Sequence, residues 1–268
     1  EKFKMIAKNP KAIFQKIYRL FYLDNLNNQR EQRFKDFSNK YIKETATKIS
    51  RDYLPNDFLN QYEYFVTGSD QVWNPFFTNA SPLYFLTFAP KEKRIAYSPS
   101  FGISELPAEY VGDFAKWIDE MAFVSVREDA GADIIKNLTG REAKVLADPT
   151  LLLTKEDWLS IAKPVSNKPK EDYLLTYFLG TVPDTTKMHI KKYAQRYNLR
   201  VINLAKPRYK EFYLTDPAEF LDFINSATLL FTDSFHGTVF SILFEKPFVV
   251  TDRNGQLPSM NSRIITLL

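Results

Sequence analysis

The sequence has no cysteine and only two histidines among its 268 residues. The absence of cysteine excludes disulfide bonds, thiolate nucleophiles and zinc sites built from thiolates, and it fits a reducing compartment. No stretch comes near the roughly 20 consecutive apolar residues that a membrane-spanning helix requires. We therefore expect a globular protein of the cytoplasm.

The sequence also lacks a strong excess of charge of one sign. Its formal net charge is +4, and Lys and Arg alternate with acidic residues rather than forming long basic blocks. A nucleic-acid partner is therefore disfavoured. Aromatic residues make up 15% of the chain. Most of them are expected in the core, with a few available to stack on sugars.

Residues 1–23 are basic and amphipathic. Pro10 can open a helix, and the apolar residues after it recur at helical spacing. Two interpretations stay open: a helix packed on the body of the protein, or a helix lying on an anionic membrane surface, at the inner face of the membrane. Residues 24–34, DNLNNQREQRF, are predicted to form a loop, or to mark a place where sequence is missing.

From residue 62 onward, predicted strands and helices alternate. The first half has strands at 62–68, 94–100, 121–128 and 143–149, and helices at 107–120 and 129–140. The second half has strands at 172–180, 199–205, 228–233 and 246–252, and helices at 184–198, 216–227 and 237–245. Asp184 and Asp216 are predicted to cap the helices that begin at them.

This alternation predicts an α/β protein with parallel sheets built from right-handed strand–helix–strand units. The segment 164–171 has two prolines and little apolar content, and we interpret it as a linker. It divides the chain into two Rossmann-like domains, 1–163 and 172–268, whose sheets face a central cleft. Such a cleft is the expected ligand site.

The stretch 229–244, LLFTDSFHGTVFSILF, places His236 where a predicted strand turns into a helix. Ligands of open α/β sheets bind outside the carboxyl ends of the strands, and a helix start favours an anion. We therefore assign Ser234, Phe235 and Gly237 to a substrate-binding turn, with His236 as a general acid. The alternative is a buried histidine that only ties the turn. His189, on a lysine-rich helix, is expected at the surface.

A second group of polar side chains follows the first strand, in TGSDQVWNP at 67–75. Its members are Ser69, Asp70, Gln71 and Asn74. Carboxylate and amide groups suit hydrogen bonds to sugar hydroxyls, and a carboxylate can take a proton from one. The alternative role is helix capping by Ser69 or Asp70. Trp73 is expected to pack in the core.

Arg127 ends the third predicted strand, where a buried positive charge needs a partner. A guanidinium can grip a ligand's carboxylate or phosphate through two parallel hydrogen bonds. The alternative partners are internal acids, for which the sequence offers Glu128, Asp129 and Asp148. Near the end of the chain, Arg253 and Arg263 flank a polar loop that could also reach the cleft.

Five segments carry a family resemblance: GSDQVWN at 68–74, IAYSPSFG at 95–102, SVRE at 125–128, ADPTLLL at 147–153 and DSFHGTVFSILFEKPFVV at 233–250. Together they resemble the polysaccharide pyruvyl transferase family, from about residue 60 to the end. GSDQVWN followed by DSFHG is the most specific part. The resemblance extends to members encoded with capsule or exopolysaccharide genes in gut-type bacteria.

The resemblance implies two Rossmann-like domains of the B-type glycosyltransferase architecture. It implies transfer of the pyruvate unit of phosphoenolpyruvate onto two hydroxyls of one sugar, forming a cyclic ketal and releasing phosphate. His236 would be the general acid or a donor ligand, Arg127 would bind the donor's carboxylate or phosphate, and Asp70 would contact the acceptor. The acceptor would be a free or lipid-linked sugar, and no metal or cofactor would be needed.

Two departures from the family pattern stand out. Many members begin with a strand and a turn resembling N-Y-G-A-x-L-Q, so the first domain is expected to be incomplete at its N-terminus. Some members carry Arg two residues before the histidine, where this chain has Ser234. The donor's charge must then be met by Arg127, Lys246, Arg253 or the helix end. The alternatives in function are a sugar-nucleotide-dependent glycosyltransferase and a non-catalytic subunit of capsule assembly.

Overall fold

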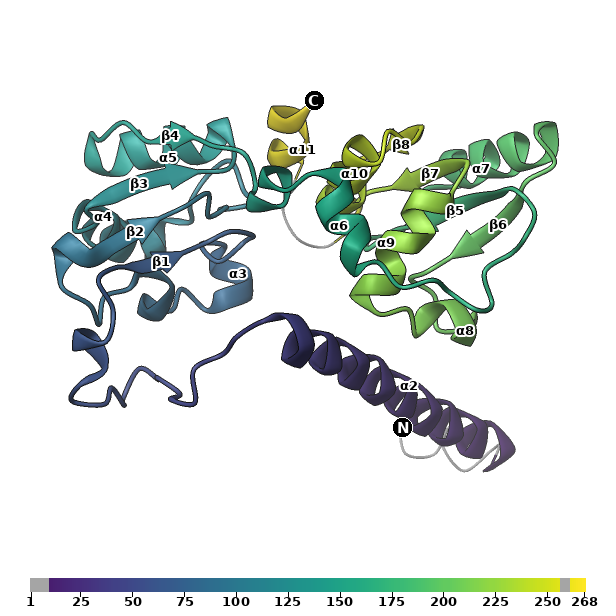
Figure 1. The fold of residues 1–268 in the computed structure, drawn as a ribbon, viewed down its shortest axis with the longest axis horizontal. Helices are drawn as coiled ribbons and strands as arrows, with labels where there is room; N and C mark the ends of the chain where they lie inside the picture. The colour runs from purple at the N-terminus through teal and green to yellow at the C-terminus, as the bar shows by residue number, and fades with distance from the viewer. Residues whose placement is uncertain (1–9, 256–260) are drawn as a thin grey trace, which may run out of the picture.

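The computed structural model describes residues 10–255 and 261–268, and this part of the chain forms two four-stranded parallel sheets (Figure 1). The first has the order β1-β2-β3-β4, with β1 (Phe65–Thr67), β2 (Arg94–Ala96), β3 (Phe123–Val126) and β4 (Lys144–Val145). The second has the order β6-β5-β7-β8, with β5 (Tyr173–Tyr177), β6 (Arg200–Asn203), β7 (Leu229–Thr232) and β8 (Phe248–Val250). The predicted α/β class with parallel sheets is confirmed.

Helices connect the strands and cover the sheets. Beside the first sheet lie α3 (Pro75–Thr78), α4 (Val111–Asp119) and α5 (Asp129–Thr139). Beside the second lie α6 (Lys155–Ile161), α7 (Asp184–Arg196), α8 (Lys210–Tyr213), α9 (Pro217–Ser226) and α10 (Phe235–Leu243). The described chain begins with the long α2 (Pro10–Tyr41) and ends with α11 (Ser262–Leu267).

Each sheet has its own apolar core. Under the first sheet, Trp73 is fully buried and stacks on Phe85 with ring centroids 5.0 Å apart, which confirms its predicted packing role. Phe101 and Phe114 complete this aromatic cluster. In the second sheet the central strand β5 is buried on both faces, as expected for a parallel strand covered by helices.

Two helices link the two halves of the molecule. α6 precedes the segment 164–171 but packs on α9 of the second sheet, and its Trp158 meets Phe240 of α10 edge to face. α11 returns to the first sheet and contacts α5, where the Asp129 amide donates to the Thr266 hydroxyl. Figure 1 shows α11 between the two sheets. The boundaries 1–163, 164–171 and 172–268 stay a prediction.

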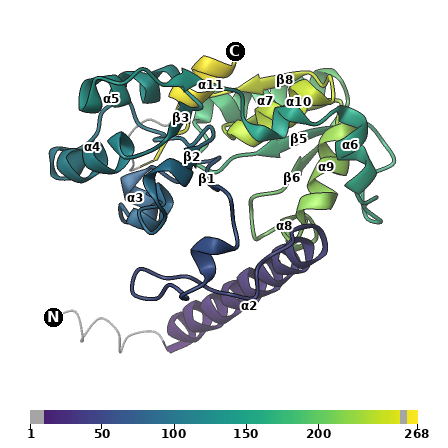
Figure 2. The same cartoon turned by 60° about the vertical axis from the view of Figure 1, so that its left-hand side comes forward.

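The predicted loop at 24–34 is wrong, because these residues belong to α2. Polar side chains there bond to partners four residues away, as Gln29 does to Asn25, and Arg33 pairs with Asp216 and Glu219 of α9. Leu26 is fully buried. α2 therefore lies against α8 and α9 (Figure 2). A loop was predicted because residues 24–34 are mostly polar, and Leu26, the one buried apolar residue among them, gives no helical periodicity by itself.

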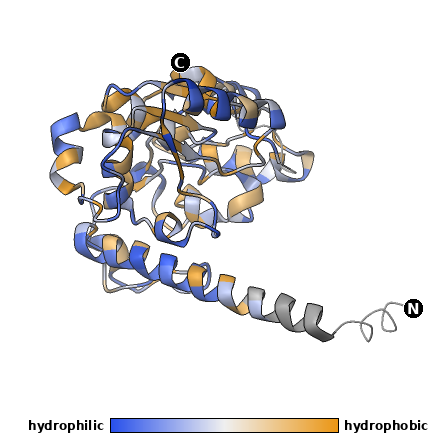
Figure 3. Ribbon diagram, turned by 90° about the vertical axis from the view of Figure 1, so that its right-hand side faces the viewer, coloured by the Kyte–Doolittle hydropathy of each residue, from blue (hydrophilic) through white to orange (hydrophobic). Residues whose placement is uncertain are grey.

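The described part of α2 is mostly hydrophilic, with scattered apolar residues (Figure 3). Tyr18 and Phe21 are largely exposed. Residues 1–9, part of the predicted amphipathic segment, lie outside the described residues. Among the helices of the described part, none combines the length and the apolar character needed to cross a membrane.

Three further local predictions are corrected. Pro183 rather than Asp184 occupies the N-cap of α7, and Asp184 pairs with Lys187 inside the first turn. α10 begins at Phe235, two residues before the predicted start, because Ser234 provides the cap. β4 is shorter than the predicted strand 143–149. The predicted cap Asp216 is confirmed, in a reciprocal capping box with Glu219.

Candidate active site

The polar residues that follow four strands of the first sheet meet residues that follow β7 of the second. From the first sheet come Ser69 and Asp70 after β1, Ser98 after β2, Arg127 after β3 and Asp148 after β4. From the second comes His236, in the first turn of α10. Because parallel strands end at the same edge of a sheet, side chains far apart in sequence gather there.

Asp148 is the centre of this cluster, and its side chain is buried. One carboxylate oxygen, Oδ2, accepts hydrogen bonds from Arg127 Nη1 and from Ser69 Oγ at 2.7 Å, and lies 3.8 Å from His236 Nε2. The other oxygen accepts from the Thr150 amide at 2.9 Å and from its hydroxyl at 2.6 Å. One carboxylate therefore links the two sheets.

These contacts keep Asp148 ionised. Burial by itself would raise the pKa of Asp148, but His236, Thr150 and the positive charge of Arg127 outweigh burial and hold that pKa far below its usual range. The result is a fixed negative charge between a guanidinium and an imidazole.

Arg127 is almost fully buried and has two carboxylate partners. Besides Asp148, its Nη2 donates to Asp70 Oδ1 at 3.2 Å, and its guanidinium lies over the Phe235 ring at 4.4 Å from the centroid. Of the internal acids considered for Arg127, the structure selects Asp148. Asp129 instead contacts Thr266 of α11.

Glu128 forms a separate buried network next to Arg127. Its Oε1 accepts hydrogen bonds from Ser100 Oγ and from the amides of Phe101 and Gly102, at 2.9, 2.9 and 3.0 Å. Its Oε2 is buried with no hydrogen-bond partner in the described part of the chain. Burial raises the pKa of Glu128 despite these bonds. The network holds the loop after β2 in place.

Asp70 differs from its neighbours because its side chain is 62% exposed. Its backbone has φ 56°, in the left-handed region that Asp tolerates better than most residues. Burial would raise the pKa of Asp70, but Arg127, His236 and Arg263 together lower it. The carboxylate is therefore ionised and accessible.

Of the other residues predicted after β1, the structure brings only Ser69 to the cluster. Asn74 is buried and caps α3 through a hydrogen bond from the Phe76 amide, so neither Ser69 nor Asp70 is the cap of that helix. Gln71 accepts a hydrogen bond from the Asn74 amide group at 3.0 Å. Gln71 and Asn74 thus shape the loop from behind the cluster.

The turn that contains His236 is held by hydrogen bonds. Asp233 accepts from the amides of Leu179 and Gly180 at 2.7 and 2.8 Å. Ser234 accepts from the Gly237 amide at 3.3 Å. A Cβ on Gly237 would lie 2.8 Å from Thr232 Oγ1, so glycine here lets the helix approach β7. The His236 side chain itself is 38% exposed.

Phe235 and Arg253 lie at the edges of the cluster. Phe235 is buried, and its ring lies near the guanidinium groups of both Arg127 and Arg263. Arg253 donates from Nη2 to the Asp233 carbonyl oxygen at 3.2 Å. It therefore supports the turn before His236.

A pocket of about 310 Å³ opens beside His236. It is lined by Arg30 and Phe34 of α2, by Tyr177, Leu179, Leu204, Thr215, Asp216, Pro217 and Phe220, and by Ser234 and His236. Aromatic faces thus stand opposite polar groups. Such a pocket is typical of binding sites for small organic molecules.

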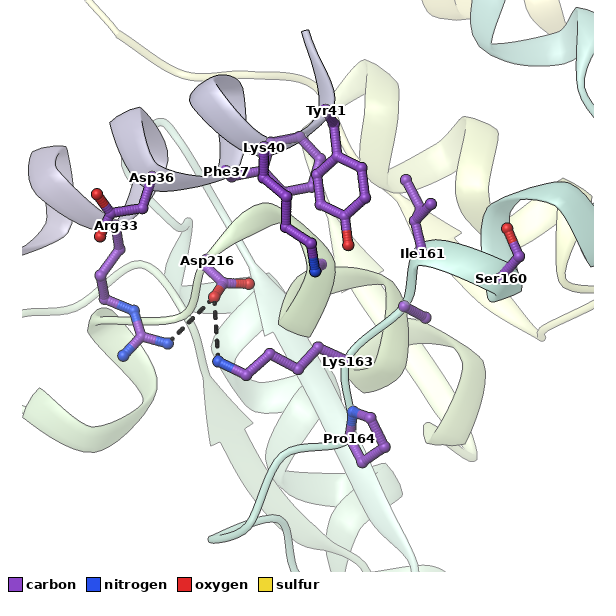
Figure 4. Close-up of a pocket in the computed structure, with 12 residues that line it drawn as sticks. Arg33, Asp36, Phe37, Lys40, Tyr41, Ser160, Ile161, Lys163, Pro164 and Asp216 are labelled. Carbon is purple, nitrogen blue, oxygen red and sulfur yellow. Dashed lines mark hydrogen bonds and ion pairs between the residues drawn. The ribbon is translucent and has the colours of Figure 1, made fainter.

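A second pocket of about 540 Å³ continues along α2 and shares Asp216 with the first (Figure 4). Lys40 and Tyr41 of α2 project into it opposite Lys163, and Arg33 and Lys163 both pair with Asp216.

His189 on α7 is exposed, which confirms its predicted surface position. It lines neither of these two pockets.

Sequence reasoning missed that Asp148 is the shared partner of Arg127 and His236. The available signal was an acidic residue directly after the fourth strand, because that position lies at the same sheet edge as Asp70 and Arg127. For Arg263 it predicted only a position beside a polar loop that could reach the cleft, without naming a partner. In the described residues, no group of three or more His, Asp or Glu side chains is placed to hold a metal ion.

Comparison with known proteins gives one match. The family model for polysaccharide pyruvyl transferase matches residues 5–255. Neither the curated proteins nor the solved structures gave a match. The matched range includes the loops after β1, β3, β4 and β7 that build the cluster around Asp148. The chain belongs to the polysaccharide pyruvyl transferase family.

Proposed function

We propose that this protein transfers the pyruvate unit of phosphoenolpyruvate onto two hydroxyls of one sugar in a capsular polysaccharide or exopolysaccharide, or its precursor. The observation that carries this proposal is the placement of His236 beside the ionised Asp148, next to a pocket with aromatic walls. An imidazole that lies beside a carboxylate and is 38% exposed can give a proton to a bound donor, while the pocket can hold the acceptor.

The reaction needs one proton donor, one proton acceptor and a site for an anion. His236 protonates the methylene carbon of phosphoenolpyruvate, which becomes the methyl group of the product. The first sugar hydroxyl then adds to the central carbon and gives up its proton. The second hydroxyl displaces phosphate from the same carbon, and its proton leaves with the phosphate. The balance is one ketal and one phosphate per donor, with no redox step.

Asp70 suits the role of the base. Its carboxylate is ionised, exposed and 3.2 Å from Arg127 Nη2, so it can accept a hydroxyl proton at the edge of the anion site. Arg127 would hold the donor's carboxylate or phosphate through its planar guanidinium. Ser69 shares Asp148 with Arg127 and orients that carboxylate.

The pocket beside His236 would hold the acceptor. Phe34, Tyr177 and Phe220 provide apolar faces, while Thr215 and Ser234 provide hydroxyl groups that can bond sugar hydroxyls. Both a free oligosaccharide and a lipid-linked one are acceptors of this kind. A lipid-linked acceptor would place the protein at the inner face of the membrane.

The test is incubation of the protein with phosphoenolpyruvate and a panel of polysaccharide repeat-unit oligosaccharides. Phosphate release and the mass of the ketal product are measured together. His236→Gln should abolish both, whereas His189→Gln, which changes the exposed histidine of α7, should leave them unchanged. A His236→Gln variant that folds and makes ketal at the normal rate would remove His236 from the mechanism.

A second measurement separates the proposal from a sugar-nucleotide-dependent glycosyltransferase. A ligand that binds the folded state raises the melting temperature in proportion to its affinity and concentration. We expect phosphoenolpyruvate to raise the Tm and nucleotide sugars to leave it unchanged. Protection by nucleotide sugars alone would favour the glycosyltransferase, and no protection by either donor would favour a non-catalytic subunit of capsule assembly.

A further inference from the structure

Arg263 is a buried arginine that the family match does not include. Only 4% of its side chain is exposed, and it lies beyond residues 5–255. Its position results from the packing of α11, because Ile264 is buried against Phe235 and Val239 of α10, and Thr266 is bonded to Asp129 of α5. The tertiary structure thus carries a second guanidinium to the edge of the cluster around Asp148.

Within the described residues, Arg263 is poorly neutralised. Arg127 and Asp148 form a buried pair of opposite charges, so the charge of Asp148 is already matched by Arg127. The nearest carboxylate oxygen to Arg263 is Asp70 Oδ1, at 3.7 Å from Nη1, which is longer than a normal hydrogen bond. Its Nε is buried with no hydrogen-bond partner among residues 10–255 and 261–268. Because a buried charge is costly unless it is paired, the site favours an additional anion.

Two guanidinium groups lie beside the carboxylate of Asp70. Arg127 Nη2 lies 3.2 Å from Asp70 Oδ1 and Arg263 Nη1 lies 3.7 Å from the same atom, while both guanidinium groups flank the Phe235 ring. The two arginines are buried, but the side chain of Asp70 is largely exposed. Asp70 is therefore the member that can move aside, and its carboxylate marks a position where an anion is stabilised from two sides.

We infer that Arg263 is a second arginine of the donor site, which binds the carboxylate or phosphate group of phosphoenolpyruvate together with Arg127. This inference rests on the proposed function. The pocket of about 260 Å³ that Arg127, Asp148, Phe235 and Arg263 line gives the guanidinium groups room to adjust.

The experiment measures binding of phosphoenolpyruvate and, separately, of inorganic phosphate and pyruvate by calorimetry. It compares the unaltered protein with Arg263→Gln and Arg263→Lys. The control is Arg200→Gln, because Arg200, at the start of β6, is an exposed arginine that pairs with Glu171. Arg263→Gln should weaken phosphoenolpyruvate binding by about tenfold to a hundredfold, since charge-assisted hydrogen bonds are lost. Arg200→Gln should bind as the unaltered protein does. Weaker binding of phosphate or of pyruvate shows which end of the donor Arg263 holds.

Thermal unfolding without ligand separates a binding role from a structural one. In the described part of the chain, no carboxylate lies within hydrogen-bond distance of Arg263, so Arg263→Gln should leave the Tm unchanged or raise it, while the rise in Tm caused by phosphoenolpyruvate should be largely lost. If Arg263→Gln does not fold, Arg263→Lys decides, because lysine keeps the charge but loses the planar fork and should bind several-fold more weakly.

Equal affinity for phosphoenolpyruvate in the unaltered protein and in the folded Arg263 variants overturns the inference. If the unaltered protein does not bind phosphoenolpyruvate, the proposed donor is wrong, and phosphate binding then decides on Arg263 alone. Phosphate binding that depends on Arg263 supports an anion site at this residue. If phosphate does not bind, the inferred anion site is overturned.

Discussion

The Nε2 atom of His236 lies 3.8 Å from Oδ2 of Asp148, the same oxygen to which Arg127 donates a hydrogen bond. This single carboxylate joins the loop after β4 to the first turn of α10, and so joins the two sheets. The contact fixes where the imidazole stands relative to the guanidinium. It makes Asp148 a positioning residue for the proposed reaction.

Asp148→Asn should destabilise the protein by about 3 kcal/mol, because it removes the buried charged partner of Arg127 and leaves only the exposed Asp70. The activity of the proposed reaction should fall with it, through kcat more than through the KM for the acceptor. Denaturant unfolding and steady-state kinetics measure both effects. Asp172→Asn, at an exposed position before β5, is the control and should change neither. A loss of less than about 0.5 kcal/mol would show that Asp148 does not stabilise the cluster.

The acid limb of the stability curve should also depend on Asp148. A carboxyl group whose pKa is lowered in the folded state stabilises the protein above its unfolded pKa of about 4, and this stabilisation is lost as the pH falls toward the folded value. The unaltered protein should therefore lose stability steadily below about pH 4. In Asp148→Asn the loss over the same range should be smaller. Parallel curves for the two proteins would contradict the assignment.

Glu128→Gln should make the unfolding free energy depend less on pH on the alkaline side of about pH 4. Burial raises the pKa of Glu128, so its contribution is fully present below the ordinary Glu value of about 4.3 and is lost as the pH rises above it. The fall in unfolding free energy as the pH rises above that value should therefore be smaller in the variant. Glu142→Gln, at an exposed site, serves as the control. A slope that does not change would show that Glu128 ionises normally.

Leu26→Ala should loosen α2 from the body of the protein. Leu26 is 1% exposed, and removing a buried leucine side chain typically costs about 2–5 kcal/mol. Phe21→Ala, on the same helix but 71% exposed, should change the stability by less than about 0.5 kcal/mol. Hydrogen exchange of the α2 amides measures the effect locally. Equal exchange rates in both variants would mean that Leu26 does not anchor the helix.

Phe34→Ala tests the pocket beside His236 as the acceptor site. We expect the KM for the acceptor to rise about three- to tenfold, with the KM for phosphoenolpyruvate unchanged, because one aromatic face is lost. Tyr197→Ala is a matched control. Both rings have an arginine 5.5 Å from the centroid, but Tyr197 lies at the end of α7 and lines neither pocket along α2. An unchanged acceptor KM in Phe34→Ala would move the acceptor elsewhere.

The sequence by itself determined the sheet class and the position of most elements from β1 onward. Short apolar runs alternating with amphipathic helices leave few other arrangements, since a central strand such as β5 must be covered on both faces while an amphipathic helix buries one. The sequence also placed Asp70, Arg127 and His236 at strand ends, where a parallel sheet gathers its functional groups. It failed for α2, whose 24–34 segment is polar and is held by contacts with α8 and α9 that no local pattern records.

Only the tertiary structure decided which charges meet. From the sequence, Arg127 had three equivalent acidic neighbours, and the choice of Asp148 depends on the pairing of β3 with β4. The approach of His236 to Asp148 requires the two sheets to lie side by side, and the arrival of Arg263 requires α11 to pack between α5 and α10. Electrostatic energy depends on distance and burial rather than on separation in sequence, so these relationships appear only once the chain is folded.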